Sequence, residues 1–217
     1  MRLRNIPSAR EELAESPYVI NEKDMAGFRG RWAETDHLPL HIEIGMGKGR
    51  FLLELARRSP DTLYIGIENY SSVLVHAVRK LDILAQSGET LHNVRLLRMN
   101  AEYLTDIFSP GEVDRIYLNF SDPWPKERHA KRRLPGRVFL GRYAQVLAAG
   151  GHVEFKTDNR SLFDFALEEA QACSWTVDAC TYDLHHDPEM SAGNVMTEYE
   201  ERFCARGNPI FKLIEHP

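Results

Sequence analysis

The chain has 217 residues, of which 43% are hydrophobic and 27% charged, and its net charge is −5 at neutral pH. These values are typical of an ordinary globular protein with one large domain. No run approaches about 18 consecutive apolar residues, so the sequence supports neither secretion nor a membrane span. Cys173, Cys180 and Cys204 form no Cys-x-x-Cys pair and indicate reduced thiols in a cytoplasmic protein.

From about residue 39, the hydrophobic pattern alternates between strands and helices. Five strands are expected, over residues 41–44, 63–67, 94–99, 115–120 and 152–156. Helices are expected over 50–58, over 138–147 with a stop at Gly150-Gly151, and over 161–172. A further helix should begin at a cap on Ser71 or Ser72 and end at Gly88.

After Trp175 the pattern indicates strands alone, over residues 175–182, 199–205 and 209–214. Five strand–helix units followed by a strand pair predict an α/β fold. Its sheet should be doubly wound and mostly parallel, with seven strands and an antiparallel C-terminal hairpin. Residues 1–38 lack clear periodicity, so we expect an N-terminal extension over 1–38 and one domain over 39–217.

A glycine-rich loop follows the first predicted strand and opens the first predicted helix. Gly45, Gly47 and Gly49 allow a sharp turn and a close approach of the backbone to a ligand. Glu68 ends the second strand, where an acid commonly accepts hydrogen bonds from ribose hydroxyls. A dinucleotide loop would place its third glycine one residue later, and Glu43 would repel a pyrophosphate. Glu43 suits the ammonium group of S-adenosyl-L-methionine, or it is a surface acid at a strand end.

Residues 121–126, Ser-Asp-Pro-Trp-Pro-Lys, follow the fourth predicted strand. The two prolines disfavour helix around Asp122, since each restricts its own φ and the residue before it. We therefore expect Asp122 and Trp124 on a stiff loop at the carboxyl end of a strand, where open α/β sheets bind ligands. The alternative is a proline-rich turn in which Trp124 fills a gap in the core.

A cationic run comes next. Residues 126–137 hold six Lys or Arg side chains and one acid, a local charge of +5, while the other residues sum to −10. A focused basic patch on an acidic body steers a polyanion to one place. An aromatic side chain, a carboxylate and this patch together favour a site for one nucleobase of a nucleic acid; a solvated surface run is the alternative.

These segments together resemble the bacterial tRNA (guanine-N7-)-methyltransferase family, which belongs to the Rossmann-like S-adenosylmethionine-dependent methyltransferases. The match runs over nearly the whole chain from about residue 40. It covers residues 43–49, 64–68, 120–126, 128–133, 155–159 and 197–200. The Asp-Pro-Trp-Pro-Lys block with its basic tail and the Thr-Glu-Tyr-Glu block are highly specific to this family.

The resemblance implies methyl transfer from S-adenosyl-L-methionine to N7 of the guanosine at position 46, in the variable loop of tRNA, by a monomer or a homodimer. It implies a cofactor site made of Glu43, Gly45, Gly47, Gly49, Glu68, Asn100 and Asp122, in which Asp122 is also catalytic. The implied substrate contacts are Lys126, Asp158, Thr197, Glu198, Tyr199 and Glu200. The implied RNA contacts are Arg128, His129, Ala130, Lys131, Arg132 and Arg133. Many relatives carry Asp where this chain has Asn100.

Guanine N7 is a reasonable target on chemical grounds as well. It carries a free lone pair, so no general base is needed, and the enzyme has to align the reactants and stabilise the positive charge that reaches guanine. Asp122 suits the second task, and Asp158 or Glu200 could accept from the N–H groups of guanine. An RNA duplex hides N7 in a deep, narrow groove, which favours a loop or an everted base stacked on Trp124 or Tyr199.

Two other functions remain open at this point. Asp-Pro-Trp resembles the loops of enzymes that methylate an exocyclic amine, although those loops lack the basic run. A non-catalytic RNA-binding module is the other possibility, against which the glycine loop, Glu43, Glu68 and Asp122 argue. Residues 185–187, His-His-Asp, have no second cluster at a matching spacing and favour a polar loop, so we expect no metal.

Overall fold

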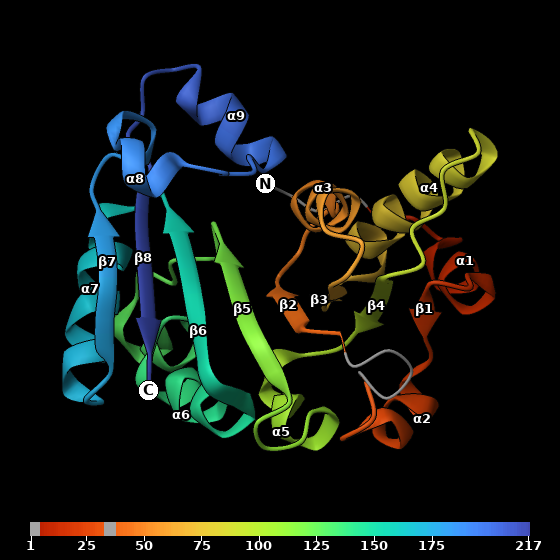
Figure 1. Ribbon diagram of the computed structural model, residues 1–217, viewed down its shortest axis with the longest axis horizontal. Coiled ribbons are helices and arrows are strands. Elements are labelled where there is room, and N and C mark those ends of the chain that lie inside the picture. The colour runs from red at the N-terminus through yellow and green to blue at the C-terminus, as the bar shows by residue number, and fades with distance from the viewer. Residues whose placement is uncertain (1–4, 33–37) are drawn as a thin grey trace.

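The computed structural model describes residues 5–32 and 38–217, and within them eight strands form one sheet (Figure 1). The strand order is β1-β4-β3-β2-β5-β6-β8-β7. Neighbours from β1 to β6 are parallel, whereas β8 is antiparallel to both β6 and β7. The bounds are β1 (Val19–Ile20), β2 (Leu40–Ile44), β3 (Leu63–Glu68), β4 (Val94–Arg98), β5 (Val113–Asn119), β6 (Leu147–Thr157), β7 (Thr176–Thr181) and β8 (Phe211–His216).

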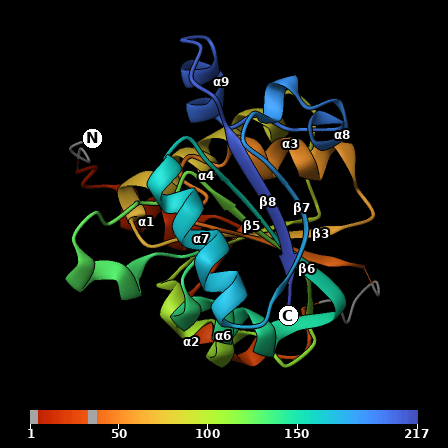
Figure 2. The same ribbon diagram turned by 90° about the vertical axis from the view of Figure 1, so that its left-hand side faces the viewer.

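Helices pack on the sheet through two clusters of buried side chains. The first cluster joins the sheet to α5, α6 and α7, and the second joins it to α1, α3 and α4. Figure 2 shows α7 beside β7 and β8. The helix bounds are α1 (Ala9–Glu15), α2 (Glu22–Met25), α3 (Arg50–Arg58), α4 (Ser71–Gln86), α5 (Leu104–Ile107), α6 (Arg137–Val146), α7 (Arg160–Ala172), α8 (Pro188–Ser191) and α9 (Glu198–Cys204). Four 3-10 turns are η1 (Ala26–Phe28), η2 (Ala101–Tyr103), η3 (Glu127–Arg132) and η4 (Leu184–His186). None of these helices is long and apolar enough to cross a membrane.

The predicted parallel sheet with antiparallel C-terminal strands is confirmed, and the helix predicted over 50–58 matches α3 residue for residue. The structure adds an eighth strand, β1, which pairs with β4 at the sheet edge. The division at residue 38 stays a prediction, and residues 33–37 next to it lie outside the described part. Residues 1–4 lie outside it as well.

The strand predicted over 199–205 is wrong, because these residues form α9. Their helix begins at a capping box: Thr197 Oγ1 accepts from the backbone N–H of Glu200, and the Glu200 carboxylate accepts from the backbone N–H of Thr197. Tyr199 and Phe203, four residues apart, lie on one helical face and stack at 4.1 Å between ring centroids. Strand β8 therefore pairs with β6 and β7 instead.

Two of the predicted helix boundaries are also wrong. The N-cap of α4 is Tyr70, and its side chain makes no capping bond, so neither Ser71 nor Ser72 serves as the cap. Helix α6 ends at Val146 without a glycine stop, since β6 begins at the next residue and continues through Gly150-Gly151.

Candidate functional site

The carboxyl ends of five adjacent parallel strands carry the acids and the amide that the sequence singled out. Asn100 follows β4, Glu68 ends β3, Glu43 lies in β2, Asp122 follows β5 and Asp158 follows β6. In strand order these residues form one row along the same edge of the sheet. The strand order reverses between β2 and β5, because β3 and β4 lie on one side of β2 whereas β5 and β6 lie on the other. Such a switch point is where doubly wound sheets bind ligands.

The glycine loop crosses this switch point. Gly45, Gly47 and Gly49 have φ values of +74°, +58° and +80°, which favour glycine. A Cβ at Gly49 would lie 2.8 Å from Ala77 Cβ, so this glycine allows α3 to pack against α4. A Cβ at Gly47 would meet nothing within 4 Å. The backbone at Gly47 therefore faces open space into which a ligand fits.

Glu43 is the most unusual group at the edge. Its side chain is buried, and Oε1 accepts from Asn119 Nδ2 at 2.9 Å. Oε2 is buried without a hydrogen-bond partner among the described residues. Burial raises the pKa of Glu43 to about 8, and the bond from Asn119 opposes that rise. A carboxyl group with a free acceptor oxygen fits a cationic ligand group. Asn119 was not predicted from the sequence as a site residue, although an amide at the end of a buried strand indicates one.

Glu68 is held in place by the backbone. Oε2 accepts from the N–H of Gly47 at 3.2 Å, and Oε1 accepts from the N–H of Tyr70 at 3.0 Å. Burial raises the pKa of Glu68, the bonds from the backbone N–H groups oppose that rise, and the negative charge of Asp122 adds to it. Asn100 caps η2, with Oδ1 accepting from the N–H of Glu102 at 3.0 Å.

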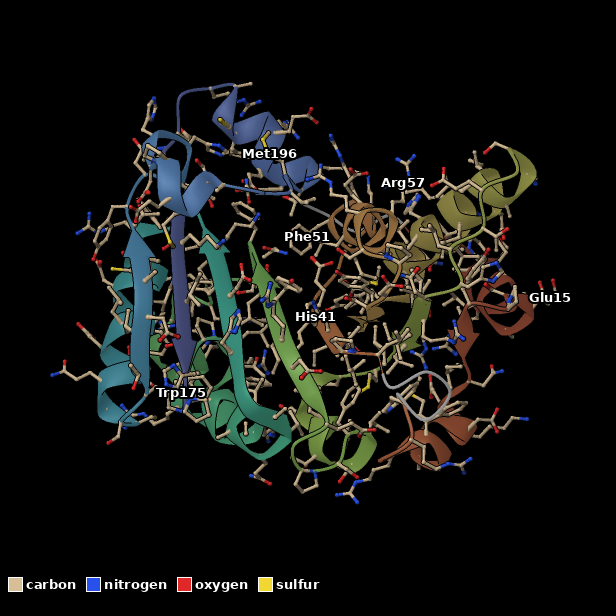
Figure 3. The ribbon with its side chains drawn as sticks, viewed as in Figure 1. Glu15, His41, Phe51, Arg57, Trp175 and Met196 are labelled. Carbon is tan, nitrogen blue, oxygen red and sulfur yellow. The ribbon has the colours of Figure 1, made fainter. Side chains whose placement is uncertain are left out.

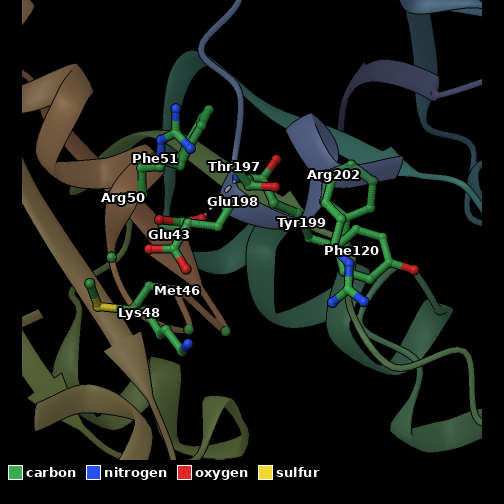
Figure 4. A pocket seen from close by; sticks show the side chains of 14 residues that line it. Glu43, Met46, Lys48, Arg50, Phe51, Phe120, Thr197, Glu198, Tyr199 and Arg202 are labelled. Carbon is green, nitrogen blue, oxygen red and sulfur yellow. Dashed lines mark hydrogen bonds between the residues drawn. The ribbon is translucent and has the colours of Figure 1, made fainter. Parts of the chain in front are cut away.

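A cavity of about 410 Å³ lies between the sheet edge and α9 (Figure 4). On the sheet side its wall is formed by Glu43, the glycine loop, Phe51, Asn119 and Phe120. On the α9 side it is formed by Thr197, Glu198, Tyr199 and Arg202. The cavity therefore places three of the predicted substrate residues opposite four of the predicted cofactor residues, Glu43 and the three glycines, whereas Glu68, Asn100 and Asp122 are not in its wall.

Tyr199 presents a partly exposed ring beside the cavity. Its hydroxyl donates to Asp158 Oδ2 at 2.9 Å, so α9 and the end of β6 are directly joined. Its ring also contacts Phe120 at 4.9 Å between centroids. Burial and the bond to Asp158 raise the pKa of Tyr199 to about 12, so the phenol stays protonated at neutral pH. This pair offers an aromatic face and a carboxylate to a flat, polar ligand.

The loop that carries Asp122 has a strained backbone and is held in place by hydrogen bonds from Arg133. Phe120 and Trp124 have φ values of +52° and +42°, which non-glycine residues rarely adopt. The Arg133 guanidinium donates to the carbonyl oxygens of Pro123 and Trp124, each at 3.1 Å. Asp122 itself is exposed on this loop.

Trp124 does not fill a gap in the core. It is half-buried, stacks on His129 at 5.6 Å between centroids and lies 4.9 Å from the Arg132 guanidinium. The indole therefore joins the acidic loop to the start of the basic run. In this conformation its ring packs within the loop, whereas Phe51, Phe120 and Tyr199 are the aromatic residues in the cavity wall.

The first half of the basic run forms η3, which extends from the body of the molecule in Figure 2, and the run ends at Arg137, the first residue of α6. Two of its six cations serve the fold: Arg133 holds the loop, and Arg137 binds Glu169 through Nε at 2.9 Å from Oε2. The others are exposed, namely Lys126, Arg128, Lys131 and Arg132. His129 and Ala130 are half-buried. The cationic surface is thus smaller than the sequence indicated, yet it lies directly beside Asp122 in the chain.

Glu200 is placed differently from its neighbours in the predicted block. It is fully buried, and its oxygens accept from Lys156, from Asn194 and from the N–H of Thr197. A contact between Glu200 and a substrate would require these bonds to break. His185 Nε2 lies 3.4 Å from Glu200 Oε1, and Asp187 caps α8. Over residues 5–32 and 38–217, no group of three or more His, Cys, Asp or Glu side chains is arranged to hold a metal ion.

Comparisons with solved structures agree with this architecture. An antibiotic-related methyltransferase has a TM-score of 0.63 at 21% sequence identity, covering 90% of this chain and 92% of that one. The 16S rRNA methyltransferase KamB has a TM-score of 0.62 at 16% identity, with coverage of 90% and 93%. At these identities the likeness concerns the fold, which is that of the Rossmann-like methyltransferases.

Comparisons of sequence identify the family as well as the fold. A family model described as a putative methyltransferase matches residues 37–213. A tRNA (guanine-N(7)-)-methyltransferase of Lachnoclostridium phytofermentans is 53% identical over 216 residues, which is 99% of this chain and 97% of the relative. The enzyme of that name from Bacillus subtilis is 46% identical over 214 residues, with coverage of 98% and 97%. With such identity over almost its entire length, and with the row of acids around a glycine loop, this chain belongs to the tRNA (guanine-N(7)-)-methyltransferase family.

Proposed function

We propose that this protein transfers the methyl group of S-adenosyl-L-methionine to N7 of a guanosine in tRNA, at position 46 of the variable loop. The family supports the reaction and the substrate class. The observation in the structure that supports it best is Glu43, which lies in the wall of the cavity beside the glycine loop and whose Oε2 is buried without a hydrogen-bond partner among the described residues. We further propose that the enzyme acts in the cytoplasm, as a monomer or homodimer, and without a metal.

The cofactor residues follow from what each group can donate or accept. S-adenosyl-L-methionine supplies an electrophilic methyl group when bound. Glu43 would accept from its ammonium group, and Glu68, fixed by two backbone N–H groups, would accept from the ribose hydroxyls. Asn100 would serve the adenine edge, and the open space at Gly47 admits the close approach of the backbone.

The remaining residues would act on the guanosine. Its N7 needs no deprotonation, so the protein has to align the base and stabilise the positive charge that develops on it. Asp122, exposed on its fastened loop, would supply the stabilising carboxylate. Tyr199 would stack on the base and Asp158 would accept from its N–H groups, while Thr197 and Glu198 line the same cavity. Lys126 and residues 128–133 would hold the RNA, mainly through the exposed cations of η3.

Transfer of a labelled methyl group to a tRNA transcript, followed by nucleoside mass spectrometry, tests this proposal. We expect 7-methylguanosine, and we expect it to disappear when guanosine 46 of the transcript is replaced by adenosine. Label in an exocyclic amine of a base would support the rival reaction instead. Absence of transfer, with tRNA still bound, would favour a non-catalytic RNA-binding module.

A further inference from the structure

A buried ion pair joins β6 to α9. Lys156 Nζ lies 2.6 Å from Glu200 Oε2, and the two side chains are almost completely buried. Burial lowers the pKa of Lys156, and the negative charge of Glu200 opposes that change. Removing two charges from water is costly, and an apolar pair of similar volume often stabilises a fold as well. Stability alone is therefore a poor reason for this pair.

All three hydrogen bonds of the Lys156 ammonium group go to one segment, residues 194–200. Its three bonds go to Glu200 Oε2, to the carbonyl oxygen of Val195 at 2.9 Å and to Asn194 Oδ1 at 3.2 Å. Glu200 Oε1 in turn accepts from Asn194 Nδ2 at 2.8 Å, and Oε2 accepts from the N–H of Thr197. Lys156 thus holds both the residues just before α9, Asn194 and Val195, and the first turn of α9.

The segment fixed in this way forms one wall of the cavity. Helix α9 contributes Glu198, Tyr199 and Arg202 to it, and Figure 4 shows these side chains across from Glu43. Phe51, which Figure 3 shows between α3 and the end of β5, lies with its ring 4.9 Å from Lys156 Nζ. Lys156 therefore stands directly behind the cavity, although it is not part of the wall.

Two other ion pairs of α9 are exposed. They are Arg50–Glu201 and Lys80–Glu198, which join α9 to α3 and α4. Exposed pairs of this kind contribute little, because water and salt screen them. In the pair Lys156–Glu200 both side chains are almost completely buried, whereas His185, 3.4 Å from Glu200 Oε1, is partly exposed.

We propose that Lys156 is a positioning residue for methyl transfer, which acts through Glu200 to set where α9 holds Tyr199 against Asp158. This inference rests on the proposed function, since it assumes that Tyr199 and Asp158 hold the target base. It also gives Glu200 a role behind the cavity rather than in contact with the substrate. A displacement of about 1 Å at a reacting group costs roughly 100-fold in rate.

The test removes the ammonium and keeps the capping box. In the double variant Lys156→Met/Glu200→Gln, the Gln side chain still has an oxygen for the N–H of Thr197, and no unpaired charge is buried. The control is Lys212→Met/Glu154→Gln, which makes the same two changes at an ion pair of 3.0 Å between β8 and β6, where Glu154 also lies 3.2 Å from Arg115 and 3.5 Å from His152. Melting temperature, hydrogen exchange, and kcat and KM for tRNA are measured on both variants.

We expect the Lys156→Met/Glu200→Gln variant to lose roughly 100-fold in kcat, while its melting temperature stays near that of the control. Amide exchange should accelerate in residues 194–204 and not in β6. The control should keep wild-type turnover. Equal kcat in the two double variants, or unchanged exchange in residues 194–204, would overturn the positioning role.

A milder variant keeps the inference testable should the double variant not fold. Asn194→Ala removes one bond to Lys156 and one to Glu200 without touching either charge. We expect about a tenfold loss in kcat from it, with faster exchange in the same segment; wild-type kcat and exchange would refute the inference. Hydrogen exchange does not depend on the reaction, so a wild-type enzyme that fails to methylate N7 would refute the proposed function and leave the anchoring of α9 separately measurable.

Discussion

Ionisation of Glu43 should be coupled to binding of S-adenosyl-L-methionine. The free protein holds this buried carboxyl with a pKa of about 8, so it is mostly protonated at pH 7. An ammonium group beside Oε2 would favour the carboxylate and lower that pKa. Binding near neutral pH should therefore release a proton from Glu43.

The size of this effect follows from linkage. Where the pH lies below the pKa of the free protein and above that of the complex, affinity rises by up to tenfold per pH unit. Between pH 6 and pH 7 we expect the dissociation constant of the cofactor to fall by about tenfold, with roughly 0.9 proton released per cofactor bound at pH 7. The amino group of the cofactor, with a pKa near that of other α-amino groups, stays largely charged over this range.

Isothermal titration calorimetry in two buffers of different ionisation enthalpy measures the released proton directly. The control is Glu43→Gln, which should bind more weakly at pH 7 and with an affinity that changes little between pH 6 and pH 7. If the wild type releases no proton, or if Glu43→Gln retains the full pH dependence, Glu43 is not the group that receives the ammonium.

Three further predictions concern the rest of the chain. Glu215 is fully buried, and burial raises its pKa from 4.5 to about 8, so the unfolded chain loses this proton first and stability falls as pH rises from 4.5 to 8. Relative to Glu215→Gln, the wild type should lose roughly 3.5 kcal/mol of unfolding free energy between pH 5 and pH 8; if urea unfolding gives the same pH dependence of this free energy for both proteins, the assignment is wrong. Asp122→Ala should lower turnover by ~10²–10³ with little change in tRNA affinity, and a variant that keeps most of its turnover would return Asp122 to a loop residue. Neutralising Lys131 and Arg132 should reduce the slope of log affinity against log salt by about 0.7–0.9 for each phosphate that the protein no longer neutralises, whereas adding Arg133→Gln should also loosen the Asp122 loop; an unchanged slope would make η3 a solvated face.

Much of the fold was predictable because the parallel strands are short apolar runs that glycines and prolines punctuate. The helix α9 was missed because Tyr199 and Phe203 are typical of strands, although Thr197 and Glu200 already had the spacing of a capping box. Strand β1 has two residues, too few for any periodicity.

The candidate site, too, could be predicted from the sequence only in part. Residues at strand ends, such as Glu43 and Glu68, could be placed because their positions follow from the parallel sheet. The role of Lys156 could not, because its partner Glu200 lies 44 residues away and the bond depends on how α9 folds back. The sequence assigns Arg133 to the basic surface, whereas its bonds to Pro123 and Trp124 come from the conformation of the loop.

The position of β8 between β6 and β7 has a consequence for how the protein is made. Synthesis produces β7 before β8, yet β8 is the strand that joins β7 to the sheet. In chain order, β7 therefore precedes its one partner strand, whereas the partners of the parallel strands from β1 to β6 all precede β7 except for β8. The side chains of β7 are largely polar or exposed in the finished fold, which suits a segment that spends this interval in water. The β7 side of the sheet is therefore completed only when β8 has paired with both β6 and β7.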